Sequence, residues 1–300
     1  MHKRLLARAT LSLLMLLSAG SAIAQRVQQV FESPQAAMEQ FGAAIRNNDG
    51  PALIAMLGDG YESIIPPVTK ADYKQFLTAW DKKHEIVMND AEHAHIGVGD
   101  KGWTLPIPIV KQRNGWMFDM DEAEDEIQMR TIGANELAVM QVLLAYHDAQ
   151  NEYAEVDRNA DGVLEYARKI QSSPGAKDGL YWPTSSSEKP SPLGELFADA
   201  AAKGALEGKG YYGYDYRVLK AQGKAAQGGA MSYLVRGKMI AGFGLIAWPV
   251  RYGDTGVMTF IINQDGQIFQ KNLGPNSTAI ARNIHTFNPD ATWTKVDPSK

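Results

Sequence analysis

Apolar residues recur at helical spacing in three stretches near the start of the chain. Ser33 and Pro34 mark a helix N-terminus, and the apolar positions that follow lie three and four residues apart: Met38, Phe41, Ile45. The break "NNDGP" ends this helix, and "ALIAML" predicts a short second one. Thr69 opens a third helix, with Asp72 placed to complete a variant of the capping box. The pattern predicts three helices before any strand.

Strand patterns follow the third helix, in "AHIGVGD" and in "KGWTLPIPIVKQRNGWMFDM". Asn114-Gly115 stands between two apolar-rich runs and predicts a hairpin with a two-residue turn. Pro106 and Pro108 have no amide donor, so this strand is expected at a sheet edge or a bulge.

The second half begins with the clearest helical pattern, from Asn135 to about residue 155. Its apolar positions line one wide face: Val139, Val142, Leu143, Tyr146, Ala149, Tyr153. A shorter helix is predicted over 163–170 and another over 193–203, with a Pro/Ser/Gly-rich linker, 172–192, between them. Three helices are therefore expected before the next strands.

Three strands are predicted in series near the C-terminus: "GKMIAGFGLIAWPVRY", "GVMTFIIN" and "GQIFQKNL". The segments "YGDTG" and Asp265-Gly266 supply the turns between them. Because "VMTFII" is apolar at nearly every position, we expect a central strand covered by the long helix. The elements predict an α+β protein with a domain over 25–130, a domain over 131–300, and the boundary near residues 126–133.

The first 24 residues have the pattern of a secretory signal peptide. A basic start (Lys3, Arg4, Arg8) precedes an apolar run and the small-residue motif that ends at Ala24. The apolar run is shorter than the ~20 residues that cross a bilayer. We expect cleavage after Ala24, a periplasmic or secreted protein, and no transmembrane segment in the mature chain.

Charge and cysteine usage exclude several classes of function. Cleavage would remove three basic residues and no acidic ones, moving the formal charge from -4 to -7. An acidic chain of this kind is not expected to bind nucleic acid or anionic membrane surfaces. The chain has no cysteine, which excludes disulfides, thiolate metal sites and cysteine catalysis.

The stretch "DRNADGVLE" is the sharpest functional signal. Asp157, Asn159 and Asp161 fall at positions 1, 3 and 5 of a calcium loop, a glycine follows at position 6, and the carbonyl of Val163 and the side chain of Glu165 fill positions 7 and 9. Position 12, where a bidentate Glu is required, is an arginine. These residues predict a weak calcium site, with a dissociation constant of ~10⁻⁴–10⁻³ M.

The same residues also fit a capped turn with no metal. Asp157 can end one helix in an Asx-turn, Asp161 can cap the next, and Gly162 can take a positive φ. Both interpretations stay open at this point.

No catalytic residue is predicted. His93 and His95 would share one face of a strand, but two more zinc ligands at motif spacing are missing, so two surface histidines on an edge strand are expected. Ser186 and Lys189 match the S-x-x-K motif of penicillin-binding enzymes, but the S-D-N and K-T-G motifs that such enzymes also need are missing. The tyrosines at 211, 212, 214 and 216 fit either strand packing or a binding surface.

Several long strings resemble an uncharacterised family of exported bacterial proteins, the domain of unknown function 2950. They include "IGANELAVMQVLLAYHDAQNEYAEVDRNADGVLEYARKI", "GLYWP" and "YGDTGVMTFIINQDGQIFQKNLG". The resemblance covers nearly all of the mature chain and implies no activity.

Two further resemblances concern the fold of each half. "NELAVMQVLLAYHDAQNEYA" with "TGVMTFIINQDGQIF" is similar to the soluble part of type IV pilins and pseudopilins, in which a long helix packs on a small antiparallel sheet and some members bind calcium. The first half, ending in "NGWMFD", resembles the nuclear-transport-factor-2-like cone fold, whose pocket often binds small molecules.

We therefore expect an exported, non-enzymatic envelope protein that binds or assists a protein partner and carries a weak structural calcium loop. The alternative is a small-ligand binder or hydrolase that uses a pocket in the first domain, lined by Trp80, Trp103 or Trp116.

Overall fold

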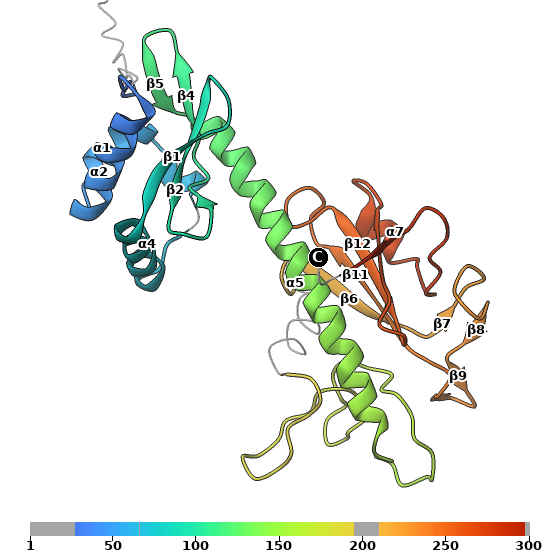
Figure 1. Ribbon diagram of the computed structural model, residues 1–300. Helices are drawn as coiled ribbons and strands as arrows, with labels where there is room; N and C mark the ends of the chain where they lie inside the picture. Colours follow the sequence, from blue (N-terminus) through green and yellow to red (C-terminus); the bar gives the residue numbers. More distant parts are fainter. Residues whose placement is uncertain (1–27, 66, 195–209, 298–300) are drawn as a thin grey trace, which may run out of the picture. The chain divides into compact units, whose positions relative to one another are not determined.

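The computed structural model describes residues 28–65, 67–194 and 210–297 (Figure 1). The chain forms two compact units, divided between Ala123 and Glu124. Each unit contains helices and antiparallel strands, which confirms the α+β class. The predicted signal peptide, residues 1–24, lies outside the described residues. Within the described residues, no helix has both the length and the apolar character needed to span a bilayer.

Four helices open the N-terminal unit: α1 (Pro34–Asn47), α2 (Gly50–Leu57), α3 (Tyr61–Ile64) and α4 (Lys70–Lys82). The capping and turn signals of the sequence predicted three of these helices, α1, α2 and α4, correctly. The Ser33 side chain accepts the amide of Ala36 at the start of α1, and Thr69 and Asp72 form a complete capping box before α4. The short α3 was not expected.

The strands of this unit are β1 (His84–Met88), β2 (His93–Val98), β3 (Trp103–Thr104), β4 (Ile109–Gln112) and β5 (Gly115–Phe118). They pair in the order β1-β2-β4-β5, and β3 also pairs with β2. The expectation that His93 and His95 lie on an edge strand is wrong, since β2 has partners on both sides. Strand neighbours are set by contacts far apart in sequence, which the local pattern does not contain.

The β4–β5 hairpin confirms a turn here but shifts it by one residue. Arg113 and Asn114 make the turn, and Gly115 begins β5 with φ 144°. The reason is a close approach from the start of the chain: Phe31 forms an antiparallel bridge with Trp116, and a Cβ at position 115 would lie 2.3 Å from the Phe31 carbonyl oxygen. Glycine is needed here for backbone contact rather than for the turn.

The long helix α5 (Met120–Ala154) begins fifteen residues before the predicted start at Asn135. Its first two turns place only Met120 and Ala123 against the core, too few apolar positions for periodicity to detect. Electrostatics favours them instead, because acidic residues are stable near a helix N-terminus, and Glu126 pairs with Arg130 one turn later. The predicted boundary at 126–133 therefore falls inside an unbroken helix, whose residue Ala123 is buried in the N-terminal core.

Residues 163–170 do not form the predicted helix. Their amides bond elsewhere: Tyr166 donates to the Met239 carbonyl, and Ala167 donates to the side chain of Gln150. The segment 172–192 is also not a free linker, because Leu180 and Trp182 are buried in the core. The predicted helix 193–203 lies almost entirely outside the described residues.

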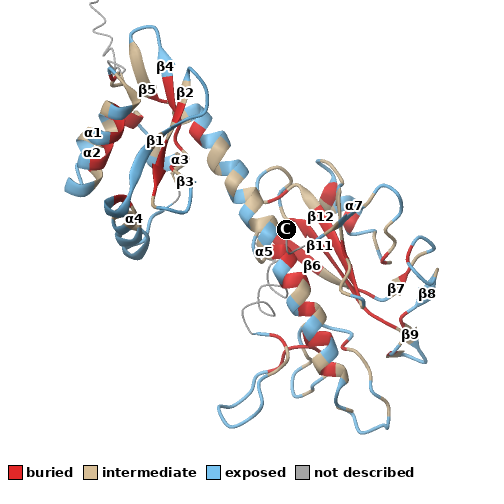
Figure 2. Cartoon of the chain, viewed as in Figure 1, coloured by how far each residue is buried: buried red, intermediate tan, exposed pale blue. Residues whose placement is uncertain are grey.

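A five-stranded antiparallel sheet is the centre of the C-terminal unit. Its order is β14-β13-β12-β11-β6, formed by β6 (Tyr214–Leu219), β11 (Gly244–Pro249), β12 (Met258–Asn263), β13 (Ile268–Asn272) and β14 (Thr294–Val296). The prediction that "VMTFII" is the central strand under the long helix is confirmed. Leu143 and Tyr146 of α5 share a buried cluster with Phe260 and Ile262 of β12, and Figure 2 shows buried residues on both α5 and the strands of this sheet.

The other face of this sheet holds a second apolar cluster, which includes Ile246, Ile261 and Phe287 and is covered in part by α7 (Ser277–Ala281). Two small hairpins extend beyond the sheet: β7 (Ala221–Gln222) with β8 (Met231–Ser232), and β9 (Leu234–Val235) with β10 (Lys238–Met239). Tyr214 and Tyr216 are buried on β6, so these two tyrosines are packing residues.

Candidate functional site

The loop after α5 brings the four predicted side-chain ligands together. The Asp157 carboxylate accepts the amide of Asp161 at 3.3 Å and that of Gly162 at 2.7 Å. Asn159 Oδ1 accepts the Asp161 amide at 3.2 Å, and Asn159 Nδ2 donates to Glu165 Oε1 at 3.1 Å. These hydrogen bonds connect Asp157 and Asn159 to the amides and to the Glu165 carboxylate within the loop.

The backbone of this loop follows a tight path. Gly162 has φ 81° and Ala160 has φ 57°, both in the left-handed region. Asp161 Oδ1 accepts the amide of Val163 at 3.1 Å, which fixes the peptide that carries the predicted main-chain ligand. These hydrogen bonds belong to both sequence interpretations, the capped turn and the calcium loop.

Two basic residues meet the loop. Nζ of Lys238, on β10, lies 2.5 Å from Asp161 Oδ2, and this ammonium is the main reason that the pKa of Asp161 is lowered. Arg168, which stands at position 12, donates to the Gly237 carbonyl at 3.0 Å. The loop is therefore joined to the β9–β10 hairpin, and Lys238 neutralises part of its negative charge.

One carboxylate oxygen in the loop is left without a partner. Glu165 Oε2 is buried and makes no hydrogen bond, although Oε1 of the same group is bonded to Asn159. A buried oxygen of this kind is unfavourable unless water or a cation satisfies it. It is the feature of this loop that fits a metal ion.

No group of three or more His, Cys, Asp or Glu side chains among the described residues is placed to hold a metal ion. The three loop carboxylates, Asp157, Asp161 and Glu165, do not form such a group, so a calcium ion there would also need the Asn159 amide oxygen and the Val163 carbonyl as ligands. Oxygen ligands of this mixed kind suit Ca²⁺ rather than a transition metal.

Arg158, inside the same loop, anchors it to the core. Its guanidinium lies 4.6 Å from the ring centre of Tyr153 and 5.0 Å from that of Trp182. Stacking of a guanidinium on aromatic faces is favourable where the group is partly desolvated. Sequence reasoning missed this contact, because Trp182 reaches the loop only after the chain has folded back over it.

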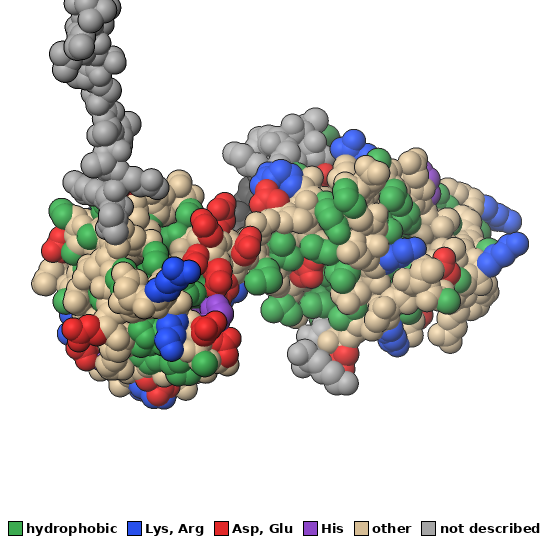
Figure 3. Space-filling model, turned by 90° about the horizontal axis from the view of Figure 1, so that it is seen from above, with side chains coloured by type: hydrophobic (Ala, Val, Ile, Leu, Met, Phe, Trp, Pro, Cys, Tyr) green, Lys and Arg blue, Asp and Glu red, His purple; other side chains and the backbone are tan. Residues whose placement is uncertain are grey.

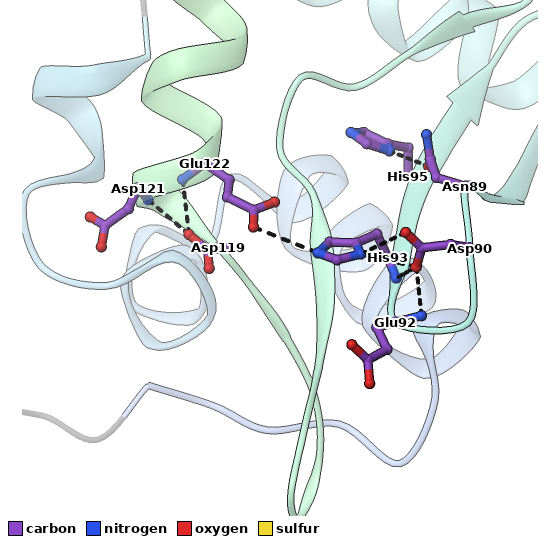
Figure 4. Close-up of polar contacts among 8 residues, drawn as sticks. All are labelled: Asn89, Asp90, Glu92, His93, His95, Asp119, Asp121 and Glu122. Carbon is purple, nitrogen blue, oxygen red and sulfur yellow. Dashed lines mark hydrogen bonds and ion pairs between the residues drawn. The ribbon is translucent and has the colours of Figure 1, made fainter.

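A second cluster of ionisable groups lies on the N-terminal unit, where acidic side chains gather beside a histidine (Figure 3). Asp90 Oδ1 accepts the amides of Glu92 and His93 at 2.7 and 2.8 Å, and Nδ1 of the His93 ring lies 3.0 Å from both Asp90 oxygens. Glu122, on α5, approaches the opposite side of the ring, with 3.6 Å between its Oε1 and His93 Nε2 (Figure 4).

These contacts set the charges in the cluster. The hydrogen bond with Asp90 raises the pKa of His93, and the Glu92 amide followed by His93 lowers the pKa of Asp90. His95, also on β2, lies with its Nδ1 2.7 Å from Oδ1 of Asn89, which belongs to the same turn as Asp90. The sequence showed the two histidines but not the carboxylates, because Glu122 comes from a helix that was predicted to start later.

The tryptophans expected around a pocket of the first domain do not surround one ligand space. Trp80 is buried among Phe41, Phe76 and the rest of the apolar core. Trp103 is 45% exposed. The alternative of a small-ligand binder or hydrolase therefore gains no support from these residues.

Comparison with known proteins gives one match. The model of a protein family described as "Protein of unknown function (DUF2950)" matches residues 28–296. No curated protein and no solved structure matches the chain.

Proposed function

This chain belongs to the family described as "Protein of unknown function (DUF2950)", a description that assigns no activity, and from its own residues we propose an exported binding or accessory protein stabilised by calcium. The metal would bind in the loop 157–165, with ligands from Asp157, Asn159, Asp161, Glu165 and the Val163 carbonyl. Its role is structural: it ties the end of α5 to the segment that follows.

The observation that supports this proposal is the buried, unpartnered oxygen of Glu165, whose other oxygen is bonded to Asn159 of the same loop. A calcium ion would satisfy that oxygen and offset the repulsion between the carboxylates. The Lys238 ammonium does part of this in the metal-free protein, which limits the affinity that calcium gains.

A binding role is supported by exposed apolar side chains next to the loop. Leu164 in the loop is 56% exposed, and Val235 on β9 and Ile240 directly after β10 are 43% and 42% exposed. Exposed large aliphatic side chains are a common component of protein contact surfaces. We therefore place the partner surface of an envelope protein here.

Thermal unfolding of the mature chain tests the calcium site. At calcium tenfold above the dissociation constant, linkage raises the free energy of unfolding by about 1.4 kcal/mol, a rise in Tm of about 2–4 °C. The double variant Asp157→Asn with Asp161→Asn should lose this rise. The matched control Asp254→Asn changes an exposed carboxylate outside the loop and should keep it.

Magnesium serves as a second control, since it demands a smaller octahedral site and should shift Tm far less than calcium. An unchanged wild-type melt between chelator and 5 mM calcium, a concentration above the expected dissociation constant of ~10⁻⁴–10⁻³ M, rejects the site.

Export is tested separately by expressing the full chain in a bacterium and fractionating the cells. The expected product is found outside the cytoplasm and begins at Gln25. A cytoplasmic product that still begins at Met1 rejects this part of the proposal.

A further inference from the structure

His93 lies between two carboxylates that come from different elements. Asp90 belongs to the turn between β1 and β2, and Glu122 belongs to the first turn of α5 (Figure 4). The two carboxylates face different nitrogens of the ring, Asp90 at Nδ1 and Glu122 at Nε2. One imidazole thus connects the sheet of the N-terminal unit to the start of the long helix.

The position of Asp90 decides which nitrogen carries the proton when the ring is neutral. Nδ1 must be the donor, because a carboxylate can only accept. Nε2 then has a lone pair directed at the Glu122 carboxylate, and no hydrogen bond forms between them. Only the imidazolium, with a proton on both nitrogens, donates to Asp90 and Glu122 together.

The helix start that Glu122 occupies is crowded with negative charge. Residues 119–126 contain six acidic side chains: Asp119, Asp121, Glu122, Glu124, Asp125, Glu126. The turn is held by Asp119, whose Oδ1 accepts the amides of Asp121 and Glu122 at 3.0 and 2.9 Å, and by burial of Ala123. Repulsion within the turn opposes these contacts, and a cation at His93 relieves part of it.

We propose that His93 is a pH-sensitive clasp for the first turn of α5: the imidazolium holds Glu122 against β2, and the neutral ring releases it. The charged and titratable groups around the ring are Asp90 and Glu92 from the turn, Glu122 from α5 and His95 from β2. The paired residue on β4 is Val110, which carries no charge. The three charges that act on the ring, Asp90, Glu122 and Glu92, are all acidic and favour the closed state.

The direction of the pH effect follows from the ring. A histidine with a raised folded-state pKa contributes stability that is complete below its unfolded value, about 6.5, and lost as pH rises through the folded value. The clasp is therefore closed in mildly acidic medium and opens as the pH rises through the raised pKa of His93. The change is local to the start of α5 and does not require the rest of the unit to unfold.

Amide hydrogen exchange in the full mature chain tests this device. After correction for intrinsic rates, the amides of residues 120–126 should be about two- to fivefold better protected at pH 6 than at pH 8, the scale of one partly exposed ion pair. Glu122→Gln and His93→Gln should each remove this difference. If His93→Gln does not fold, Glu122→Gln alone decides.

Glu124→Gln is the matched control, since it removes the same charge from the same turn but has no contact with His93. It should retain the pH difference. Equal effects of Glu122→Gln and Glu124→Gln would show that total charge matters and the His93 contact does not, which rejects the clasp. So would equal protection of the wild-type amides at the two pH values.

A spectroscopic measurement supports the same test. The His93 ring titration, assigned by its absence in His93→Gln, should move to lower pH in Glu122→Gln. If the midpoint of the His93 titration is the same in Glu122→Gln as in the wild type, Glu122 does not interact with the imidazolium and the proposal fails.

Discussion

Lys238 and Asp161 form an ion pair, with 2.5 Å between Nζ and Oδ2, that joins the β9–β10 hairpin to the loop after α5. The same carboxylate is a proposed calcium ligand. The lysine ammonium and a calcium ion would compete for this oxygen. The ion pair therefore stabilises the loop without metal and lowers the affinity of the loop for calcium.

Lys238→Met should therefore tighten calcium binding. Removal of the competing charge is expected to lower the dissociation constant about two- to fivefold, the scale of a partly exposed ion pair. Isothermal titration calorimetry measures this directly. Lys220→Met, at an exposed lysine of the same region, is the control and should leave the constant unchanged. Weaker binding in Lys238→Met would mean that the lysine assists the site.

Gly133→Ala should stabilise the protein by about 0.5–1 kcal/mol. Gly133 lies in the interior of α5, and a Cβ there meets no atom within 4 Å, so alanine gains helix propensity without a clash. Gly115→Ala should instead destabilise by about 2–4 kcal/mol, because its Cβ would collide with the Phe31 carbonyl. Urea unfolding of both variants measures the two changes in the free energy of unfolding, which should have opposite signs. A destabilising Gly133→Ala would indicate a break in α5.

Gln150→Leu should cost about 2–4 kcal/mol of unfolding free energy. The fully buried Gln150 amide accepts the Ala167 N–H at 2.8 Å, donates to the Ala167 carbonyl at 2.9 Å and donates to the Tyr146 hydroxyl at 2.8 Å. Leucine fills the volume but leaves the Ala167 amide and carbonyl without the Gln150 partner, while the Tyr146 hydroxyl keeps its bond to the Gly244 carbonyl. Asn151→Leu, on the exposed side of the same turn, should change stability by less than about 0.5 kcal/mol.

Asp178 should contribute to the acid sensitivity of the protein. The ammonium of Lys169, followed by the Ser173 amide, lowers the pKa of Asp178 to about 2. A lowered pKa stabilises the fold above the unfolded value near 4, and that stability is lost as pH falls toward 2.

Since Asp178 is 34% exposed, solvent screening reduces the contribution to about 1 kcal/mol. Asp178→Asn should flatten the stability profile between pH 4 and 2, measured by urea unfolding at each pH. A profile identical to that of the wild type would mean that the ion pair does not persist in solution.

Local patterns predicted the local parts of this structure. Thr69 and Asp72 are three residues apart and form their capping box by themselves, and the apolar face of α5 follows directly from spacing. The hydrogen bonds that Asp157 and Asp161 accept from the amides of Gly162 and Val163 are of the same kind, since donor and acceptor lie within five residues. Such features depend on backbone geometry over one turn.

The missed features depend on partners from distant parts of the chain. The interior position of β2, the Lys238 ammonium at the loop and the Glu122 carboxylate at His93 arise only when separate elements meet. The false helix over 163–170 has the same origin, because the amide of Tyr166 is bonded by Met239 and that of Ala167 by the Gln150 side chain. Periodicity carries no information about such competing partners.

The division between the two compact units falls within α5, after Ala123. A cut there would sever a continuous ladder of i→i−4 hydrogen bonds and leave new orphan carbonyls on one side and orphan amides on the other. Ala123 would remain with the first core, and the residues from Val139 onward with the second. The two units are therefore not interchangeable modules. A recombination that joined either unit to a different domain would have to interrupt α5 within a helical turn.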